Sequence, residues 1–364
     1  MKAESFKINS ENLEDSLAKA VKSGMTEFTL QDSSILNHKG RLIKFLNFVE
    51  RQCSELFLTL PLSAEILDMD VCRACSQINC SIEIPLAGES KNGAYLFDKK
   101  FYSRRAQTLN TLGLVFGFEL DFARSAGDSV KLFRDRLNFA VSLYPNHIDF
   151  PQLELFSEEK NCGEKSGKKS ENENFQKFVS SNQKILEEKS DFPLPSPTST
   201  FSTQDIKMTM ETAFACQVFY TFGRAVAWFL AVLKPLKMTS DKFFKDFAEW
   251  QNHSSCGLES KWNVDKSSHK EIEKMQLEFL KFKYAEKNKD ELFEVVSNVV
   301  RLNGVLSRLY GEGEESVLEL SYNPDELLGG GAMDIQSFFD NSFMENSRVK
   351  VFFGENGEAE YRYC

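Results

Sequence analysis

Cysteine side chains are the first candidates for chemistry in this sequence of 364 residues, because three of the eight are closely spaced. Cys72, Cys75 and Cys80 follow the pattern C-x2-C-x4-C, and Cys256 lies in a segment HSSC. Thiolates bind zinc and iron–sulfur clusters, so these four cysteines form a candidate set of metal ligands. The alternative is structural, since buried cysteine commonly packs as a small apolar side chain. The spacing favours the structural interpretation, because Cys72 and Cys75 lie on an expected helix and Cys80 begins an expected strand.

Carboxylates near the ends of expected strands form a second set of candidates. This set contains Asp32, Glu83, Glu119 and Asp121. The carboxyl ends of the strands form the active-site face of a β/α barrel, where two such groups could act as general acid and base. Nothing in the sequence brings the four together, and each could equally be solvated or cap a helix. The four histidines lack a metal-binding spacing, and neither a nucleophile elbow nor a phosphate loop occurs.

Five short apolar segments alternate with amphipathic helical segments in the first half of the sequence. This alternation predicts βαβ units, a parallel sheet and right-handed crossovers. The apolar character of the strands predicts that both faces of the sheet are covered. The expected fold is therefore α/β, a partial TIM-like (β/α) barrel of about five parallel strands. The expected strands are 26–32, 55–62, 80–88, 114–122 and 147–156.

Changes in composition divide the sequence into four parts. Residues 1–156 form the expected partial barrel, and 157–205 form a linker that is first polar and then rich in Pro, Ser and Thr. Residues 206–312 form a helical domain, and 313–364 a tail that ends in a β-hairpin with a turn at Asn356-Gly357. The expected helices of the helical domain are 206–236, 241–251, one that opens with the capping box Ser268–Glu271, and one that ends at Gly311.

Net charge and composition exclude several classes of function. The formal charge of −10 argues against a general nucleic-acid-binding protein, which needs a concentrated basic surface. Arg224 lies near the middle of the apolar segment 213–233, which favours a buried helix over a membrane span. The start of the sequence lacks the apolar stretch of a signal peptide, and the irregularly spaced cysteines fit reduced thiols. We therefore expect a cytoplasmic protein that neither crosses membranes nor binds nucleic acid.

Three segments in a fixed order carry a resemblance to a known family. They read FTLQDSS, IEIPLAG and FELDFARSAGDSVKLFRDRLNFAVSLYPNHI, and the resemblance covers residues 6–154. In this order and spacing the sequence resembles the radical S-adenosylmethionine superfamily, and within it the cobalamin-associated members. The resemblance implies a 4Fe–4S cluster and S-adenosylmethionine as cofactors, and it leaves cobalamin as an open question.

The cluster ligands that the resemblance implies are missing from this sequence. The family holds its cluster with C-x3-C-x2-C, which lies one helix before the segment matched by FTLQD. Here the first cysteine is Cys53, and C-x3-C-x2-C does not occur. For radical chemistry we therefore expect the missing strand and cysteine motif to lie on another polypeptide or upstream of the given first residue.

The resemblance also implies four cofactor-binding residues. Glu83 matches an acidic strand residue beside the nucleoside or methionyl group, and Asp32 matches the polar turn that meets the methionyl amine. Gly127 and Asp128 match the end of the family's GLPGD segment. Two positions of that segment depart from the family pattern, with Ala123 and Ser125 in place of its glycine and proline.

Three hypotheses for function follow. In the first, the chain is a radical S-adenosylmethionine-like protein that is inactive alone in radical chemistry or is half of a split enzyme. In the second, it is a non-catalytic scaffold or binding protein derived from that fold. In the third, it is a cluster-free β/α-barrel enzyme, which would need a pair of strand-end carboxylates to converge.

Overall fold

The computed structural model describes residues 13–22, 24–87, 89–91, 94–123, 127–153, 195, 197–331 and 333–364. The chain forms two compact units, one over 1–155 and 182–202, and the other over 156–181 and 203–364. Most of the expected linker and residues 124–126 of the ARSAGD segment lie outside the described residues.

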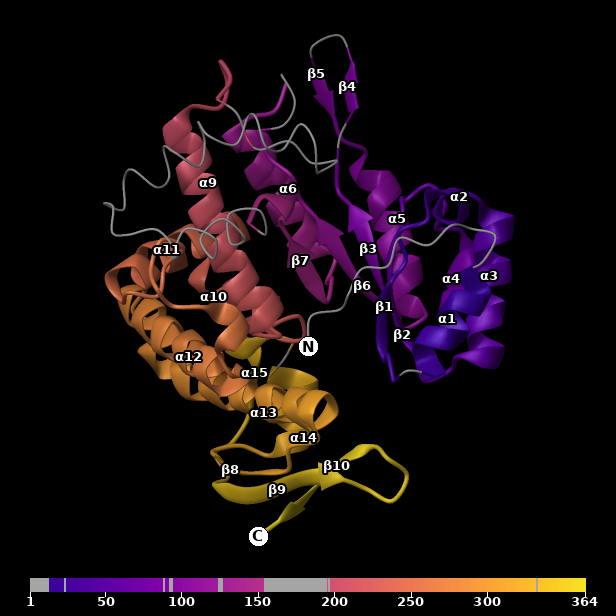
Figure 1. Ribbon diagram of the computed structural model, residues 1–364. Coiled ribbons are helices and arrows are strands. Elements are labelled where there is room, and N and C mark those ends of the chain that lie inside the picture. Colours follow the sequence, from indigo (N-terminus) through magenta and orange to yellow (C-terminus); the bar gives the residue numbers. More distant parts are fainter. Residues whose placement is uncertain are drawn as a thin grey trace. The chain divides into compact units, whose positions relative to one another are not determined.

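The first unit is built on one sheet of five parallel strands (Figure 1). The strand order is β1-β2-β3-β6-β7, which confirms the predicted fold class. The strands are shorter than predicted, and the last one ends at Asp149 because residues 151–153 are already helical. The strands are β1 (Glu27–Thr29), β2 (Phe57–Pro61), β3 (Cys80–Pro85), β6 (Val115–Glu119) and β7 (His147–Asp149).

The crossover helices follow from the strand order. Neighbouring strands follow one another along the chain without a reversal, and right-handed crossovers then place every helix on the same side of the sheet. In Figure 1, α3, α4 and α5 lie on one side of β1, β2 and β3. A sheet with helices on one side is the wall of a barrel, whereas a doubly wound sheet reverses its order. The helices are α1 (Leu13–Lys22), α2 (Ser33–Leu36), α3 (Lys39–Gln52), α4 (Met69–Cys75), α5 (Lys99–Thr111) and α6 (Val130–Ser142).

The two faces of this sheet differ in polarity. The residues of the helix-covered face are apolar and at most 2% exposed: Phe28, Leu58, Leu60, Ile82, Ile84, Phe116, Phe118 and Ile148. Strand register and alternation place a polar set on the opposite face, which we call the polar face: Thr29, Thr59, Ser81, Glu83, Glu119, His147 and Asp149. The expectation of uniformly apolar strands therefore holds for one face. Within the described part of the first unit the helices lie on that face, so apolar and polar residues alternate along the strands.

A short hairpin between β3 and α5 was not predicted. It consists of β4 (Glu89–Lys91) and β5 (Ala94–Leu96), which pair antiparallel. It begins directly after the expected end of strand 80–88, and β3 itself stops at Pro85.

The second unit is mainly helical and has an aromatic core. The ring of Phe219 lies between 4.9 and 5.9 Å from those of Phe229, Phe243 and Phe247. Most of these contacts are edge-to-face, an arrangement that contributes about 0.5–1.5 kcal/mol per pair beyond burial. The main helices are α9 (Thr203–Cys216), α10 (Phe229–Leu236), α11 (Ser240–His253), α12 (His269–Glu286), α13 (Phe293–Glu312) and α15 (Ile335–Asn341), with short turns at α14 (Pro324–Glu326), η3 (Val264–Lys266), η4 (Asp290–Leu292) and η5 (Leu327–Gly331).

The single helix predicted over 206–236 is interrupted. After α9 the chain forms a π-helix, η2 (Gln217–Phe222), and then turns at Gly223 and Arg224 before α10 begins. Arg224 has a left-handed backbone (φ 48°), and its guanidinium pairs with Glu312. The carbonyl of Gly223 accepts a hydrogen bond from Gln276 Nε2 at 3.0 Å instead of continuing a helix. These long-range contacts outweigh the local preference for one helix.

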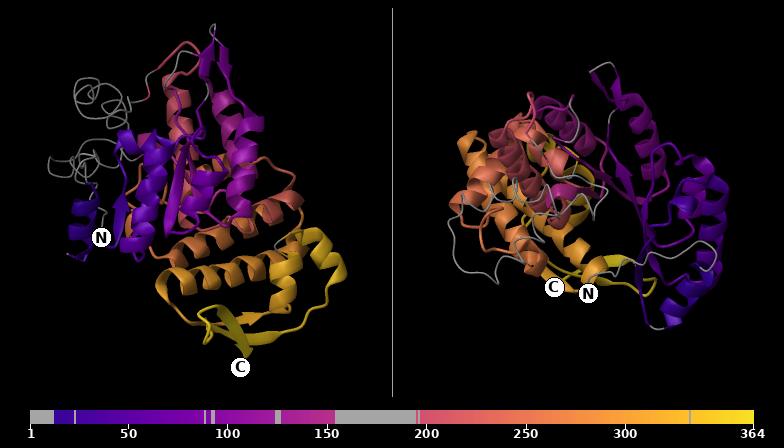
Figure 2. Two further views of the ribbon diagram at one scale, coloured as in Figure 1. Left: turned by 90° about the vertical axis from the view of Figure 1, so that its right-hand side faces the viewer. Right: turned by 45° about the horizontal axis from the view of Figure 1, so that its top comes forward.

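Other expectations for this unit are confirmed. Residues 241–251 lie in α11, and the capping box joins Ser268 to Glu271 at the start of α12. The C-terminal hairpin pairs β9 (Ser347–Phe353) with β10 (Ala359–Tyr363), and Gly357 takes a positive φ of 78° in its turn. The structure adds β8 (Ser316–Leu320), which pairs with β9 in a three-stranded antiparallel sheet beside α13 (Figure 2). Within the described residues, none of the helices combines the length and apolar character that a membrane crossing needs.

His269 makes the stability of the second unit depend on pH. Burial, Arg224 and Arg308 together lower its pKa to about 4, and its Nδ1 accepts a hydrogen bond from Arg308 Nη1 at 3.0 Å. Between its ordinary pKa and about 4, the unfolded state binds the extra proton, so stability falls as pH is lowered. We expect a loss of about 3 kcal/mol across that window. Urea unfolding followed by tryptophan fluorescence measures it, since all three tryptophans belong to this unit.

The control for this experiment is His269→Gln, which removes the titrating group. Its free energy of unfolding should be lower than that of the wild type at neutral pH and should fall less between neutral pH and pH 4. If the free energy of unfolding falls equally steeply with pH in the variant and in the wild type, His269 is not the group responsible for the pH dependence.

Candidate functional site

A hydrogen-bonded row of three side chains crosses the polar face. His147 Nε2 lies 2.9 Å from Ser81 Oγ, and His147 Nδ1 is hydrogen-bonded to the carboxylate of Asp149. Ser81 comes from β3, whereas His147 and Asp149 come from β7, two strands away. Ser81 is 7% exposed, and the side chains of His147 and Asp149 are 19% and 30% exposed. The row therefore joins a buried hydroxyl to a partly accessible imidazole and carboxylate.

Gly117 makes this row possible. It lies on β6 between the other two strands, opposite Glu83 on one side and His147 on the other. A Cβ at this position would lie 2.1 Å from Nδ1 and Cε1 of His147, so the imidazole occupies the space that any side chain would take. The missing side chain lets His147 reach across β6 to Ser81.

The carboxylates around His147 favour its charged form. Burial acts to lower the pKa of His147, but the hydrogen bond and charge of Asp149, with the charge of Glu83, outweigh burial and raise that pKa. When neutral, the imidazole donates Nδ1–H to Asp149 and accepts the Ser81 hydroxyl at Nε2. When protonated, it donates at both nitrogens. The row can therefore take up or release one proton without losing either contact.

Glu83 and Glu119 complete the polar face around this row. Glu83 lies in register with Gly117 and His147, and Glu119 in register with Asp149. Both glutamates are half-buried. Of the four strand-end carboxylates considered from the sequence, the structure brings Glu83 and Glu119 to one face.

Asp32 and Asp121 lie elsewhere and make other contacts. Asp32 caps α2, where its carboxylate accepts a hydrogen bond from the backbone N–H of Ser34 at 2.8 Å. Asp121 follows β6 and accepts a hydrogen bond from Arg136 Nη1 at 2.8 Å. A contact of Asp32 with a cofactor stays a prediction.

Asp128 belongs to a buried ion cluster at the start of α6. It is 2% exposed and accepts hydrogen bonds from the backbone N–H groups of Ala123 and Ser129 at 2.9 Å, and from Arg136 Nη2 at 3.3 Å. Burial is the largest effect and raises the pKa of Asp128, although Arg136 acts in the other direction. These contacts hold the loop after β6, and cofactor binding by Gly127 and Asp128 stays a prediction.

Ala123 explains one departure from the family pattern. Its backbone is left-handed (φ 53°), a conformation that favours glycine. The hydrogen bond from its N–H to Asp128 holds this conformation although a side chain is present. The loop thus keeps a glycine-type backbone at the position where the resemblance leads one to expect glycine.

The cysteines of the candidate metal set are buried thiols. Cys72 and Cys75 lie on α4, and the thiol of Cys80 points to the carbonyl of Cys75, with 3.6 Å between Sγ and O. Burial raises the pKa of both Cys72 and Cys256 to about 11, and the hydrogen bond with Cys80 and burial raise the pKa of Cys75. In the part of the chain that the structure describes, no three His, Cys, Asp or Glu side chains are arranged to hold a metal ion. Cys72, Cys75, Cys80 and Cys256 therefore do not form the ligand set of a 4Fe–4S cluster, whereas Cys162 lies outside the described residues.

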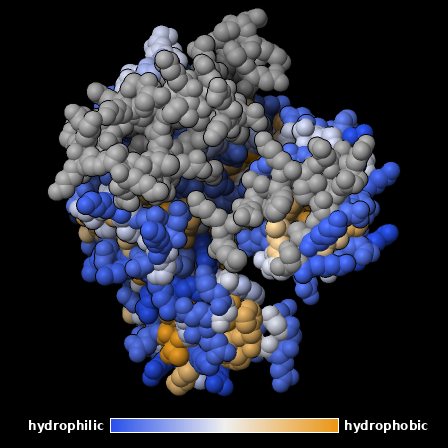
Figure 3. All heavy atoms as spheres, in the orientation of Figure 1, coloured by the Kyte–Doolittle hydropathy of each residue, from blue (hydrophilic) through white to orange (hydrophobic). Residues whose placement is uncertain are grey.

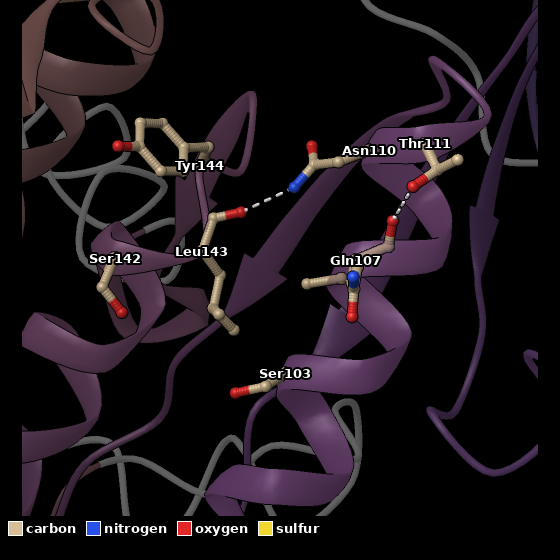
Figure 4. Close-up of a pocket in the computed structure, with 8 residues that line it drawn as sticks. Ser103, Gln107, Asn110, Thr111, Ser142, Leu143 and Tyr144 are labelled. Carbon is tan, nitrogen blue, oxygen red and sulfur yellow. Dashed lines mark hydrogen bonds between the residues drawn. The ribbon is translucent and has the colours of Figure 1, made fainter. Parts of the chain in front are cut away.

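A groove of about 410 Å³ lies on the helical side of the first unit, between α5 and the end of α6 (Figure 4). Asn110 crosses it by donating a hydrogen bond from Nδ2 to the carbonyl of Leu143 at 3.0 Å. Its lining consists of Ser103, Ala106, Gln107, Asn110, Thr111, Ser142, Leu143 and Tyr144. It contains no carboxylate, histidine or cysteine, so the polar face is the better candidate for chemistry.

Sequence reasoning missed the row of Ser81, His147 and Asp149. A signal was present, because polar residues occupy alternate positions in the segments CSIEIP and HID. This period is typical of a strand with one polar face. The distance between Ser81 and His147 along the chain, 66 residues, hid the contact.

Comparison with known proteins adds little. The sequence matches neither a protein-family model nor a curated protein. Part of the chain is similar to two solved structures of the radical S-adenosylmethionine methyltransferase TsrM from Kitasatospora setae, one with cobalamin and a 4Fe–4S cluster bound and one with tryptophan substrate and aza-SAM, an S-adenosylmethionine analogue. Each match has 13% identity and a TM-score of 0.33, and covers 40% of this chain and 29% or 30% of the other. The match thus spans less than a third of those chains, and the fold assignment rests on the strand order instead.

Replacing Gly117 with alanine tests the geometry of the row. The new Cβ would overlap the imidazole, so His147 must move and lose its contacts. We expect Gly117→Ala to lower the free energy of unfolding by about 1–3 kcal/mol, measured by urea unfolding with circular dichroism. Gly40→Ala is the matched control, because nothing lies within 4 Å of a Cβ there. If both variants behave alike, His147 does not depend on the space at Gly117.

Replacing Asp149 with asparagine tests the electrostatics. Loss of the carboxylate removes the strongest influence that raises the pKa of His147, so burial should then dominate. We expect the pKa of His147 to lie above about 6.5 in the wild type and to fall below it in Asp149→Asn. NMR titration of the imidazole Hε1 signals measures this, because the chain has four histidines. If the pKa of His147 is the same in Asp149→Asn as in the wild type, Asp149 does not raise that pKa.

Proposed function

We propose that this chain is a radical S-adenosylmethionine-like half-barrel that binds a small molecule on its polar face and does not build an iron–sulfur cluster alone. One observation carries the proposal: Ser81, His147 and Asp149 form a hydrogen-bonded row beside Glu83. Polar groups are placed on a sheet face at the cost of desolvation, which hydrogen bonds among them offset in part. Such a row on the concave wall of a barrel is suited to orienting a ligand.

S-adenosylmethionine is the ligand that the sequence resemblance supports. Glu83 corresponds to the acidic strand residue beside the nucleoside or methionyl group, and it lies in the same register row as His147. The carboxylates of Glu83 and Asp149 can accept hydrogen bonds from ribose hydroxyls or an ammonium group, while both nitrogens of His147 are bonded to Ser81 and Asp149. Cobalamin is not part of this proposal, because no described set of residues argues for it.

A partner chain is the proposed source of cluster chemistry. Cys72 and Cys75 on α4 and Cys80 at the start of β3 are buried, and within the described residues they form no metal-binding group. Among the described strands, β1 pairs with β2 alone and is one edge of the sheet. In the split-enzyme form of the proposal, a strand of the partner pairs with β1 and carries the cysteine motif. In the scaffold form, the partner covers this edge without chemistry.

A cluster-free acid–base enzyme is the second candidate. The order of hydrogen bonds from serine through histidine to aspartate is that of catalytic triads on other folds. Ser81 is buried, which suits a proton relay better than attack on a substrate. Under this hypothesis His147 exchanges a proton with the ligand, and Asp149 sets its tautomer.

Anaerobic reconstitution with iron and sulfide, followed by iron counting and electron paramagnetic resonance, tests the first part of the proposal. We expect no stoichiometric cluster in the purified chain. Calorimetric titration with S-adenosylmethionine tests the second part, and Glu83→Gln should weaken binding about tenfold through loss of a charged hydrogen bond. Glu50→Gln, on the exposed face of α3, is the matched control and should bind as the wild type does.

The outcomes separate the hypotheses. A stoichiometric cluster would contradict the proposal and restore an enzyme with an unusual ligand set. If the chain does not bind S-adenosylmethionine, the two hypotheses that remain are the non-catalytic scaffold and the cluster-free acid–base enzyme. Equal affinities of Glu83→Gln and the wild type for S-adenosylmethionine would show that this ligand does not contact Glu83 on the polar face.

A further inference from the structure

Strand β10 is an open edge of the C-terminal sheet. The order of this sheet is β10-β9-β8, so among the described strands β10 pairs with β9 alone. Backbone N–H groups of Gly354 and Cys364 donate to the carbonyls of Glu358 and Arg348. In an antiparallel ladder the pairs alternate, so the even-numbered residues bond to β9 and the odd-numbered residues point their N–H and C=O groups away from it. Tyr361 and Tyr363 thus offer both groups to a further strand, whereas the N–H of Ala359 donates to the hydroxyl of Tyr310.

The edge lacks part of the usual protection against pairing. Natural edge strands are short, carry charged side chains (especially lysine) or proline, or contain a bulge, and the two charged residues of β10 are of opposite sign. The sequence of β10 is AEYRY, which contains neither lysine nor proline, and its five residues pair with β9 in unbroken register. Tyr310 covers one group of the edge, because its hydroxyl accepts a hydrogen bond from Ala359 N–H at 3.1 Å.

We propose that β10 pairs antiparallel with β10 of a second copy of this chain, about a two-fold axis at Tyr361. This register places the two Tyr361 residues opposite each other as a hydrogen-bonded pair, since their N–H and C=O groups point outward. Ala359 then faces Tyr363 of the other copy at each end, and its N–H exchanges the hydrogen bond to the Tyr310 hydroxyl for one to the carbonyl of that Tyr363. The two sheets become one sheet of six strands, an isologous interface of the kind that C2 dimers use.

Charge complementarity favours this occupant and this register. Glu360 and Arg362 lie on either side of Tyr361, so the two-fold axis brings each Glu360 opposite Arg362 of the other copy. These are non-hydrogen-bonded positions, where facing side chains lie closest. Both residues are exposed, and neither has an ion-pair partner among the described residues. Arg362 lies over the ring of Phe352, which holds the guanidinium above the outer face of the sheet.

Apolar surface gathers at the same place. Tyr363 is 57% exposed, Tyr310 63% and Phe353 38%. The space-filling view shows hydrophobic residues at the surface over β8, β9 and β10 (Figure 3). The small side chain of Ala359 leaves room for the facing Tyr363, so the pairing removes part of this surface from water.

Sedimentation velocity of the full chain over a series of concentrations tests the proposal. The wild type should form a dimer as the concentration rises. Arg362→Glu places glutamate opposite glutamate twice, and Glu360→Arg places arginine opposite arginine, so each variant alone should be a monomer. An equimolar mixture of the two variants should form a heterodimer, because each glutamate then faces an arginine. Glu355→Arg, in the turn of the same hairpin, changes charge equally and should leave the dimer unchanged.

Recovery in the mixture distinguishes lost pairing from lost folding, since misfolded variants would not recover. A wild type that stays monomeric at the highest concentration overturns the proposal. A dimer that survives Arg362→Glu overturns it too, because that dimer uses another surface. Retained S-adenosylmethionine binding in the monomeric variants would show that association and the polar face are independent.

Discussion

The parallel ladder β1-β2-β3-β6-β7 is the constraint on which the rest of the first unit depends. Each strand joins the next through a right-handed crossover, and the order never reverses, so the helices have one side to occupy. The apolar residues of the strands then have a single core to enter. The other face is left to the alternate residues, which include Ser81, Glu83, Glu119, His147 and Asp149. The strand order therefore decides which face of the sheet can hold the candidate site, and the side chains on that face then decide its chemistry.

Two histidines show how the surroundings decide the charge of the same side chain. His147 lies beside Asp149 and Glu83, which outweigh burial and raise its pKa. His269 lies beside Arg224 and Arg308, and burial and these cations lower its pKa to about 4. The first histidine stabilises the fold most when it is protonated, below its unfolded pKa, whereas the second stabilises it when neutral. The groups that lower the pKa of His269 come from other elements, whereas Asp149 lies two residues from His147 on the same strand and Glu83 comes from β3.

The second unit is organised by aromatic packing around Phe219 and by polar ties at the break in its longest apolar segment. Gln276 and His269 from α12 both contact the carbonyl of Gly223, and Arg224 pairs with Glu312 at the end of α13. These contacts fix α12 and α13 against the turn between η2 and α10. The C-terminal sheet then packs on α13 and leaves β10 as its outer strand. The same unit therefore contains a dense aromatic core and a sheet whose outer strand β10 pairs with β9 alone among the described strands.

Much of the architecture was determined by the sequence alone. The alternation of apolar strands with amphipathic helices predicted a parallel sheet, and Asn356-Gly357 predicted the C-terminal hairpin, because strand periodicity and turn chemistry are local properties. The capping box at Ser268 and Glu271 is local for the same reason. Tertiary structure decided which strand residues meet. Ser81 and His147 are 66 residues apart and come together because Gly117 has no side chain between them. Tertiary structure also interrupted the expected helix at Arg224 and buried the cysteines, since long-range packing and ion pairs are strong enough to override local preference there.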